Sequence, residues 1–223
     1  MRKWIFLSLV LGAFPPLALA EEVSCENPLI SVTGRNSEFA QRTCEAVKYA
    51  EALFQRCNVP PFRTPIKFSI VEGIEPGCVA QLHCGEDWIE ILEPPAMDKR
   101  RSPDGAFGFL PIDAYFQSVV VHELAHAVYD HLPCPLQTCI ATNEYVAYAM
   151  QVMSLKSDDR LAFQNNAGLD REILDDELNA VILSMAQGVF ARRVWAHLSQ
   201  REDMCGYIGQ ITSGTVFLDR DMP

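Results

Sequence analysis

The chain has 223 residues, with 29 acidic side chains against 18 lysines and arginines, and a net charge of −11. This excess of negative charge disfavours nucleic acids and anionic lipid surfaces as partners. Hydrophobic residues make up 49% of the sequence, and a chain of about 200 residues can bury one sizeable core. Because no repeat or long linker interrupts the sequence, we expect a single domain.

Residues 1–20 have the features of a secretory signal peptide. Arg2 and Lys3 precede an apolar run over residues 4–11, and Ala-Leu-Ala at 18–20 matches an A-x-A cleavage site. The apolar run is too short to form a stable membrane anchor. We therefore expect cleavage near Ala20 and export to a periplasm or to the outside of the cell, with residues 21–223 as the mature domain.

All eight cysteines follow this segment, and an even number of cysteines in an exported chain indicates disulfides. Cys44 and Cys57 lie on one predicted helix at roughly 20 Å from each other, so they should not pair together. Two pairs bracket short segments and are the expected bridges: Cys134 with Cys139, and Cys78 with Cys84.

The elements expected in the first half of the chain alternate between helix and strand. Apolar spacing predicts a helix over residues 37–56, and alternation predicts a strand over 66–71. Residues 79–83 and 88–92 are further strand candidates. Residues 93–112 contain several prolines and glycines, so we expect a long irregular segment there, followed by a helix for which Asp113 is the N-cap.

The next helix carries the most informative motif, His122-Glu123-x-x-His126. Residues four apart share one helix face, so both imidazoles can reach one Zn²⁺. Glu123 is then placed to take a proton from a metal-bound water. The flanking residues are apolar nearly all round, which indicates a buried helix rather than a solvated one, and buried histidines and carboxylates need partners.

A zinc site needs a third protein ligand, and the best candidate is Glu144. The extended metzincin motif is excluded because its third histidine position holds Leu132. A second helix is predicted over residues 141–153, with Glu144 in its first turn, and a short connection makes the two helices antiparallel neighbours. The alternative is that Glu144 only complements the helix dipole; Asp130 and His131 are then the next candidate ligands.

The segment from 119 to 128, Val-Val-Val-His-Glu-Leu-Ala-His-Ala-Val, is similar to the thermolysin-like active-site helix, and Asn143-Glu144 is similar to the pair that carries the third ligand there. Over residues 113–155 the chain thus resembles a gluzincin, although it is far shorter than the well-known members. The resemblance implies one Zn²⁺ held by His122, His126 and Glu144, with Glu123 as general base and acid.

One position departs from that pattern. Thermolysin-like enzymes have an aspartate four residues after the ligand glutamate, where this chain has Tyr148. A phenol can form a hydrogen bond with His122, so Tyr148 is a candidate partner of that ligand. No motif matches the residue that stabilises the transition state in the family; Tyr145, His197 and Tyr207 are candidates, and spacing favours none of them.

The C-terminal third is expected to be mostly helical. Apolar residues recur at helical spacing from residue 169 to 201, which indicates helices packed under the zinc site. Gly206, Gly209 and Gly214 suggest a looser tail. The expected fold is α+β: a zincin-like core with an N-terminal helix, a small sheet, the His-Glu-x-x-His helix, the glutamate-ligand helix and C-terminal helices, forming a single metallopeptidase domain over residues 21–223.

The resemblance implies an exported zinc metallopeptidase that hydrolyses peptide bonds of a peptide or protein substrate through water activated by Glu123. A strand between residues 79 and 92 should then form the sheet edge that receives an extended peptide, with Trp88, Ile89 and Ile91 in the subsite wall; core packing of those three side chains is the alternative. Two other functions remain open: a non-catalytic zinc-binding or interaction module, and a zinc hydrolase of a non-peptide amide.

Overall fold

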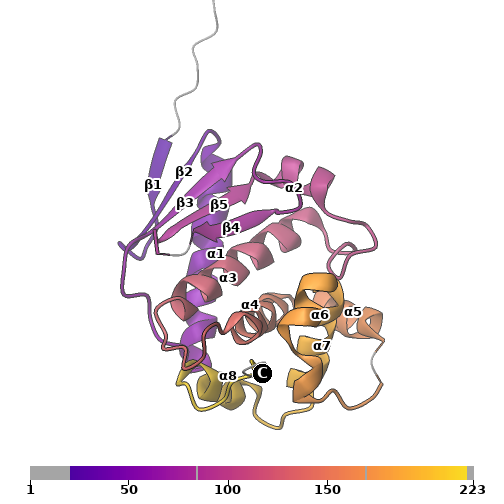
Figure 1. The fold of residues 1–223 in the computed structure, drawn as a ribbon. Coiled ribbons are helices and arrows are strands. Elements are labelled where there is room, and N and C mark those ends of the chain that lie inside the picture. Colours follow the sequence, from indigo (N-terminus) through magenta and orange to yellow (C-terminus); the bar gives the residue numbers. More distant parts are fainter. Residues whose placement is uncertain (1–20, 84, 169, 220–223) are drawn as a thin grey trace, which may run out of the picture.

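The computed structural model describes residues 21–83, 85–168 and 170–219. The predicted signal peptide lies outside these residues. The protein is a mixed α+β fold, with a small sheet on one side and the helices gathered against and below it (Figure 1). Within the described ranges, no helix combines the length and the apolar character needed to cross a membrane.

The sheet has five strands in the order β1-β2-β3-β5-β4. Its three central strands are parallel, and the two edge strands, β1 and β4, are antiparallel to their neighbours. The predicted strands are confirmed as β3, β4 and β5, whereas β1 and β2 were not predicted. The bounds are β1 Glu21–Ser24, β2 Ile30–Gly34, β3 Ile66–Val71, β4 Ala80–His83 and β5 Trp88–Leu92.

The predicted first helix is confirmed as α1, Ser37–Arg56. The Asn36 side chain caps it by accepting a hydrogen bond from the Glu38 amide at 2.9 Å. Its buried face includes Ala46, Ala50 and Leu53, and it packs on β1 and β2 as well as on the motif helix. This helix therefore connects the sheet to the helical half of the molecule.

The prediction of an irregular segment over 93–112 was partly wrong, because α2, Pro94–Arg100, lies within it. Its two prolines occupy the first helical positions, where the missing amide hydrogen has no cost, and Met97 is fully buried. The expected N-cap was also wrong. The motif helix α3, Ile112–Tyr129, has Pro111 at that position, and Asp113 lies in the first turn, where it pairs with Arg42.

The helix after the motif helix is α4, Ile140–Ser154. Among the described residues, three α-helices and one 3₁₀ turn lie between α4 and the last helix. They are α5 Ser157–Ala167, η1 Asp175–Glu177, α6 Ala180–Met185 and α7 Gln187–Ser199. The expectation of a mostly helical C-terminal third is confirmed, with η1, α6 and α7 between residues 169 and 201. Asn179 starts α6 by accepting hydrogen bonds from two backbone amides, and Ala186 separates α6 from α7 with a non-helical backbone. Apolar spacing does not reveal such breaks.

The expectation of a loose glycine-rich tail was wrong. Gly206 and Gly209 lie in α8, Met204–Thr212, whose start is capped by Asp203 through a 2.8 Å hydrogen bond from the Gly206 amide. The helix is also tethered covalently, because Cys205 forms a disulfide with Cys57 at the end of α1. Tertiary anchoring here overrides the low helix propensity of glycine.

The predicted Cys134–Cys139 bridge is confirmed, with 5.9 Å between the Cα atoms. The prediction that Cys44 and Cys57 do not pair together is also confirmed. The predicted Cys78–Cys84 bridge involves a residue outside those that the structure describes. Disulfides in the described ranges join Cys25–Cys44, Cys57–Cys205 and Cys134–Cys139, and such bridges fit an exported protein.

Candidate metal centre

The motif helix α3 and the following helix α4 pack against each other in antiparallel orientation. His126, near the end of α3, contacts Asn143 near the start of α4, whereas Ser118 near the start of α3 contacts Gln151 near the end of α4. Glu144 is therefore level with the motif. Because α4 begins at residue 140, Glu144 lies beyond its first turn, contrary to the prediction, and the dipole explanation for its charge is weakened.

The donor atoms of His122, His126 and Glu144 converge on one point, all within 4.8 Å of one another. The two Nε2 atoms are 3.0 Å apart, and each lies 3.7 or 3.8 Å from a carboxylate oxygen of Glu144. Donors bound to one tetrahedral zinc at 2.0–2.1 Å are separated by about 3.3 Å. The three side chains thus fit a small divalent cation with minor adjustment.

The hydrogen bonds around His126 define which ring nitrogen faces this point. Its Nδ1 atom lies 2.8 Å from Oδ1 of Asn143, and an amide oxygen can only accept, so Nδ1 carries the proton. Nε2 is left with a lone pair for a metal. In addition, Oε2 of Glu144 is buried without a hydrogen-bond partner among the described residues. A bound cation would satisfy both groups.

Glu123 lies in the same site and is only 6% exposed. Burial raises its pKa to about 7; the charge of His126 opposes this increase, and the neighbouring carboxylate of Glu144 adds to it. A carboxyl group that titrates near neutral pH can both accept a proton and return it. Glu123 therefore has the protonation behaviour expected of a general base and acid.

These residues line a cavity of about 590 Å³ between the sheet edge and the helices. Its lining comes from the edge strand β4, from α3 and α4, from the loop before α3 and from the start of α7. The wall residues outside α3 and α4 include Ala80, Gln81 and Leu82 of β4, Phe107 of the loop, and Gly188 and Ala191 of α7.

The backbone of β4 has free hydrogen-bonding groups on the side of the cavity. Val79 accepts a hydrogen bond from Leu92 of β5 at 2.9 Å, and pairing then alternates along the antiparallel register. Residue 81 consequently bonds to β5, while the N–H and C=O groups of Ala80 and Leu82 face the open edge. The Leu82 amide reaches Glu123, whose pKa it lowers.

The three apolar residues expected in the subsite wall do not line the cavity. β5 lies inside the sheet, between β3 and β4, so Ile89 and Ile91 are fully buried in the core. Trp88 stacks on His83 and donates a hydrogen bond to Ser69 at 2.9 Å. The alternative of core packing is the correct one for Ile89 and Ile91.

The other sequence candidates separate into two groups. Tyr148 lines the cavity, and its ring packs edge-on against His122 with 4.6 Å between centroids. Tyr145 follows Glu144 and therefore faces the other side of α4. Its hydroxyl lies 2.9 Å from Nδ1 of His197, and Tyr207 packs against both rings. None of those three lines the cavity.

Two residues that line the cavity, Tyr115 and Gln151, were not predicted from the sequence. Tyr115 lines the cavity beneath the guanidinium of Arg101, and Gln151 lines it from α4. Tyr115 precedes His122 by seven residues, and Gln151 follows Glu144 by seven, so each lies two turns from a candidate ligand on the same helix face. That spacing was the signal available in the sequence.

The fold and the site together describe a mixed α+β protein with a candidate His-His-Glu metal centre. The chain belongs to a family of unknown function, DUF6639, whose profile matches residues 30–221 and so includes both ligand helices. No curated protein and no solved structure matches the chain. The family description names no activity, so the chemistry of the site has to indicate the function.

Proposed function

We propose that the protein is an exported zinc metallopeptidase of the gluzincin type. The observation that carries the proposal is the convergence of His122, His126 and Glu144 in a cavity that also holds the buried carboxyl of Glu123. Two imidazoles and one carboxylate are a donor set found in catalytic zinc sites, which keep one position open. The open cavity beside the three donors is consistent with such a position.

The arrangement of elements supports a zincin-like core. The motif helix lies beneath a small sheet whose antiparallel edge strand β4 borders the site, and the glutamate helix returns antiparallel to the motif helix. The resemblance in residues 113–155 implies this order of elements. The three disulfides fit export of the mature chain.

When bound, zinc would supply a Lewis acid that polarises a carbonyl and acidifies water. The residues of the chain provide the rest. Glu123 accepts the proton of the attacking water and delivers it to the leaving amine, for which a pKa of about 7 is suitable. Asn143 holds the His126 ring, and the free backbone groups of Ala80 and the carbonyl of Leu82 can pair with an extended peptide.

Two features of the cavity, the buried carboxyl of Glu123 and the open edge of β4, favour this function over the alternatives. A non-catalytic zinc module has no need for a buried carboxyl with a raised pKa at the site. A hydrolase of non-peptide amides would use the same metal and Glu123, but it would not need the backbone groups of Ala80 and the carbonyl of Leu82 that face the cavity. A peptide substrate makes use of both features.

Glu123→Gln tests the proposal. The amide keeps the size of the side chain but cannot accept the proton, so hydrolysis of casein and of a broad peptide library should fall by about 10²–10⁴-fold, while zinc content is unchanged. Glu90→Gln, the same change on β5 outside the cavity, should keep wild-type activity. Equal activity of Glu123→Gln and wild type would contradict the mechanism, and a zinc-loaded but inactive wild type would favour a binding module.

A further inference from the structure

The two histidines of the site differ in how they are held. Nδ1 of His126 is bonded to Asn143, whereas Nδ1 of His122 is buried and has no hydrogen-bond partner within the described part of the chain. A histidine that binds a metal through one nitrogen usually donates its other N–H to a neighbouring acceptor, which fixes the ring. His122 therefore needs an acceptor from the residues around it.

Tyr148 is not that acceptor. It occupies the position expected from the resemblance, four residues after Glu144, but its contact with His122 is between the two rings, which lie at 67° to each other. None of the described hydrogen bonds joins its hydroxyl to His122. Tyr148 packs the ring of His122 without satisfying its nitrogen.

Gln151, one turn further along α4, has the required chemistry. It is 3% exposed and lines the same cavity as His122. Its Nε2 donates to Oγ of Ser118 at 3.2 Å, and the Ser118 hydroxyl in turn donates to the carbonyl of Tyr115 at 2.8 Å. Because Ser118 uses its only proton on Tyr115, it must accept from Gln151.

This chain of bonds fixes which end of the Gln151 amide is free. With Nε2 committed to Ser118, Oε1 is the atom left to accept a further hydrogen bond. Oε1 is not bonded to Nδ1 of His122 in this structure, but the two side chains line the same cavity. Burial and the charge of His126 lower the pKa of His122, and Gln151, as a hydrogen-bonding neighbour, acts in the opposite direction. An acceptor next to an imidazole N–H has this effect.

We propose that Gln151 is the positioning residue of His122, whose Nδ1–H donates to Oε1 of Gln151 so that Nε2 is presented to the metal. The inference rests on the proposed metal centre. It assigns the two histidines to two neutral amide acceptors, Asn143 for His126 and Gln151 for His122, both supplied by the helix that carries Glu144.

Zinc affinity of the mature chain, measured by competition with a chromophoric chelator, tests this assignment. Gln151→Leu should weaken zinc binding by about 10–100-fold, the usual effect of losing such a partner. Gln151→Glu keeps an acceptor and should bind zinc at least as tightly as wild type. Tyr148→Phe keeps the ring and should leave the affinity unchanged. Ser118→Ala removes the hydroxyl that orients the Gln151 amide, so it should weaken zinc binding, by less than Gln151→Leu does.

Thermal unfolding of the metal-free variants separates positioning from packing. A packing role alone would lower the melting temperature of Gln151→Leu and leave its zinc affinity within about twofold of wild type, which would overturn the proposal. If the leucine variant does not fold, Gln151→Met carries the same prediction with a more adaptable side chain. Loss of affinity in Tyr148→Phe but not in Gln151→Leu would assign the role to Tyr148 instead.

The same titration distinguishes this inference from the metal centre on which it rests. A wild-type chain that binds no zinc would overturn the metal centre and this assignment together. A wild-type chain that binds zinc no more tightly than Gln151→Leu would overturn only the role of Gln151.

Discussion

The contacts of single side chains favour Glu144 as the proposed third ligand. The two alternatives, Asp130 and His131, lie at the end of α3 but bond away from the site. Asp130 accepts from the Gly85 amide at 3.1 Å, and His131 contacts Thr64 and Asp87 at 3.0 and 3.2 Å. Both therefore tie the end of α3 to other parts of the chain, whereas Glu144 has a buried oxygen free for a metal.

Glu144→Ala should accordingly remove the metal from the protein. Loss of a direct ligand should weaken zinc binding by more than the roughly 100-fold that an outer partner can cost. Elemental analysis after dialysis against a weak chelator measures this, with wild type holding one zinc per chain. Asp130→Ala removes the same charge near the site and should retain zinc. Undiminished zinc in Glu144→Ala would show that another residue is the third ligand.

The sequence predicted the three side chains that converge at the candidate metal centre better than the residues that surround them. The spacing of His122, Glu123 and His126 follows from helix geometry alone, and Glu144 follows from a short connection between helices. Gln151 and Tyr115 could not be assigned in this way. Their roles depend on which neighbouring helix approaches and on which hydrogen bonds remain unused, and neither is expressed in residue spacing.

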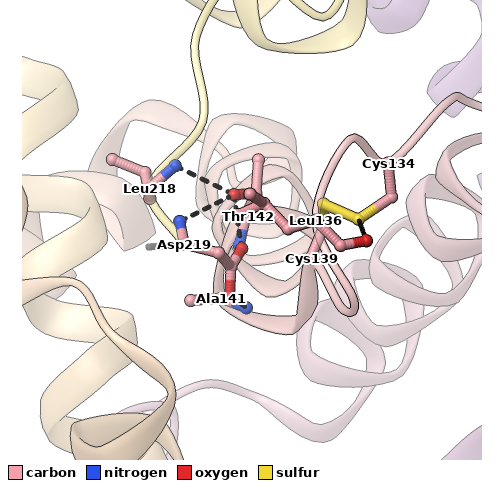
Figure 2. The surroundings of a disulfide bond; sticks show 7 residues. All are labelled: Cys134, Leu136, Cys139, Ala141, Thr142, Leu218 and Asp219. Atoms are coloured by element: carbon pink, nitrogen blue, oxygen red, sulfur yellow. Dashed lines mark hydrogen bonds between the residues drawn. A yellow bond between two sulfur atoms is a disulfide. The ribbon is translucent and has the colours of Figure 1, made fainter. Parts of the chain in front are cut away.

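At the scale of elements, the start of the ligand helix α4 is held by the C-terminal segment. The helix has no side-chain cap of its own. Asp219 takes this role: its carboxylate accepts from the backbone amides of Ala141 and Thr142 at 3.0 and 2.8 Å and from the Thr142 hydroxyl at 2.6 Å (Figure 2). The Cys134–Cys139 disulfide closes the loop just before these residues.

Asp219→Ala should therefore destabilise α4 from a distance of 78 residues in sequence. Loss of an N-cap costs about 1 kcal/mol, which corresponds to a fall in melting temperature of about 2–4 °C for a domain of this size. Asp219→Asn keeps one acceptor and should lose less. Asp170→Ala, at an exposed aspartate, is the matched control and should melt like wild type. Identical melting of all four proteins would refute the capping role.

Element prediction succeeded where one face of an element is clearly apolar, and it failed where the chain changes direction. α1 and β3 follow directly from their periodicity. β2 has the same alternation, since Ile30 and Val32 are buried and the residues between them are partly exposed. The strand is only five residues long, so the alternation is too short to predict it. The helix that contains Gly206 does have a local signal, its N-cap Asp203, besides the disulfide of Cys205. The non-helical backbone at Ala186 is not marked by apolar spacing.

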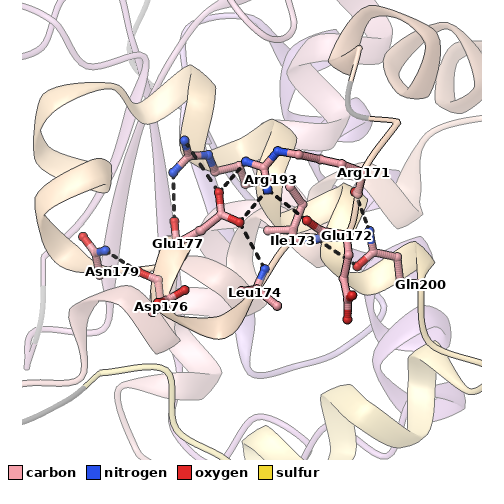
Figure 3. A network of polar contacts seen from close by, with 9 residues as sticks. All are labelled: Arg171, Glu172, Ile173, Leu174, Asp176, Glu177, Asn179, Arg193 and Gln200. Atoms are coloured by element: carbon pink, nitrogen blue, oxygen red, sulfur yellow. Dashed lines mark hydrogen bonds and ion pairs between the residues drawn. The ribbon is translucent and has the colours of Figure 1, made fainter.

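At the scale of the whole molecule, polar contacts fix how the C-terminal segments pack against one another beside the cavity. Glu177 binds Arg171 through both carboxylate oxygens, and Arg193 of α7 donates to its backbone carbonyl at 3.2 Å (Figure 3). The guanidinium of Arg171 lowers the pKa of Glu177 to about 2. These contacts hold the segment before α6 against α7, which forms one wall of the cavity.

Deeper in the molecule, His197 joins the same segment to α4. It is 1% exposed, with Nδ1 at 2.9 Å from the Tyr145 hydroxyl and Nε2 at 3.0 Å from Asp175. Burial lowers the pKa of His197, the charge of Arg201 lowers it further, and Asp175 opposes both. Because this network lies away from the cavity, we assign it to stability rather than to catalysis.

The depressed pKa of His197 predicts that stability declines in mild acid. The unfolded chain takes up this proton near the ordinary value of 6.5, whereas the folded protein resists it to lower pH. Between those two values the unfolded state binds more protons, so the free energy of unfolding falls as the pH decreases through that window and is retained above it. Urea unfolding at pH 8 and pH 5 measures this loss directly.

His197→Gln should remove the part of this pH dependence that His197 contributes. At pH 8 the variant should be less stable than wild type by about 1–3 kcal/mol, because Tyr145 loses a buried partner. Between pH 8 and pH 5 it should lose less stability than wild type does, since glutamine has no proton to take up. His131→Gln, at an exposed histidine, should keep the wild-type loss. Equal losses in wild type and His197→Gln would place the acid sensitivity at another group, of which buried His122 is the next candidate.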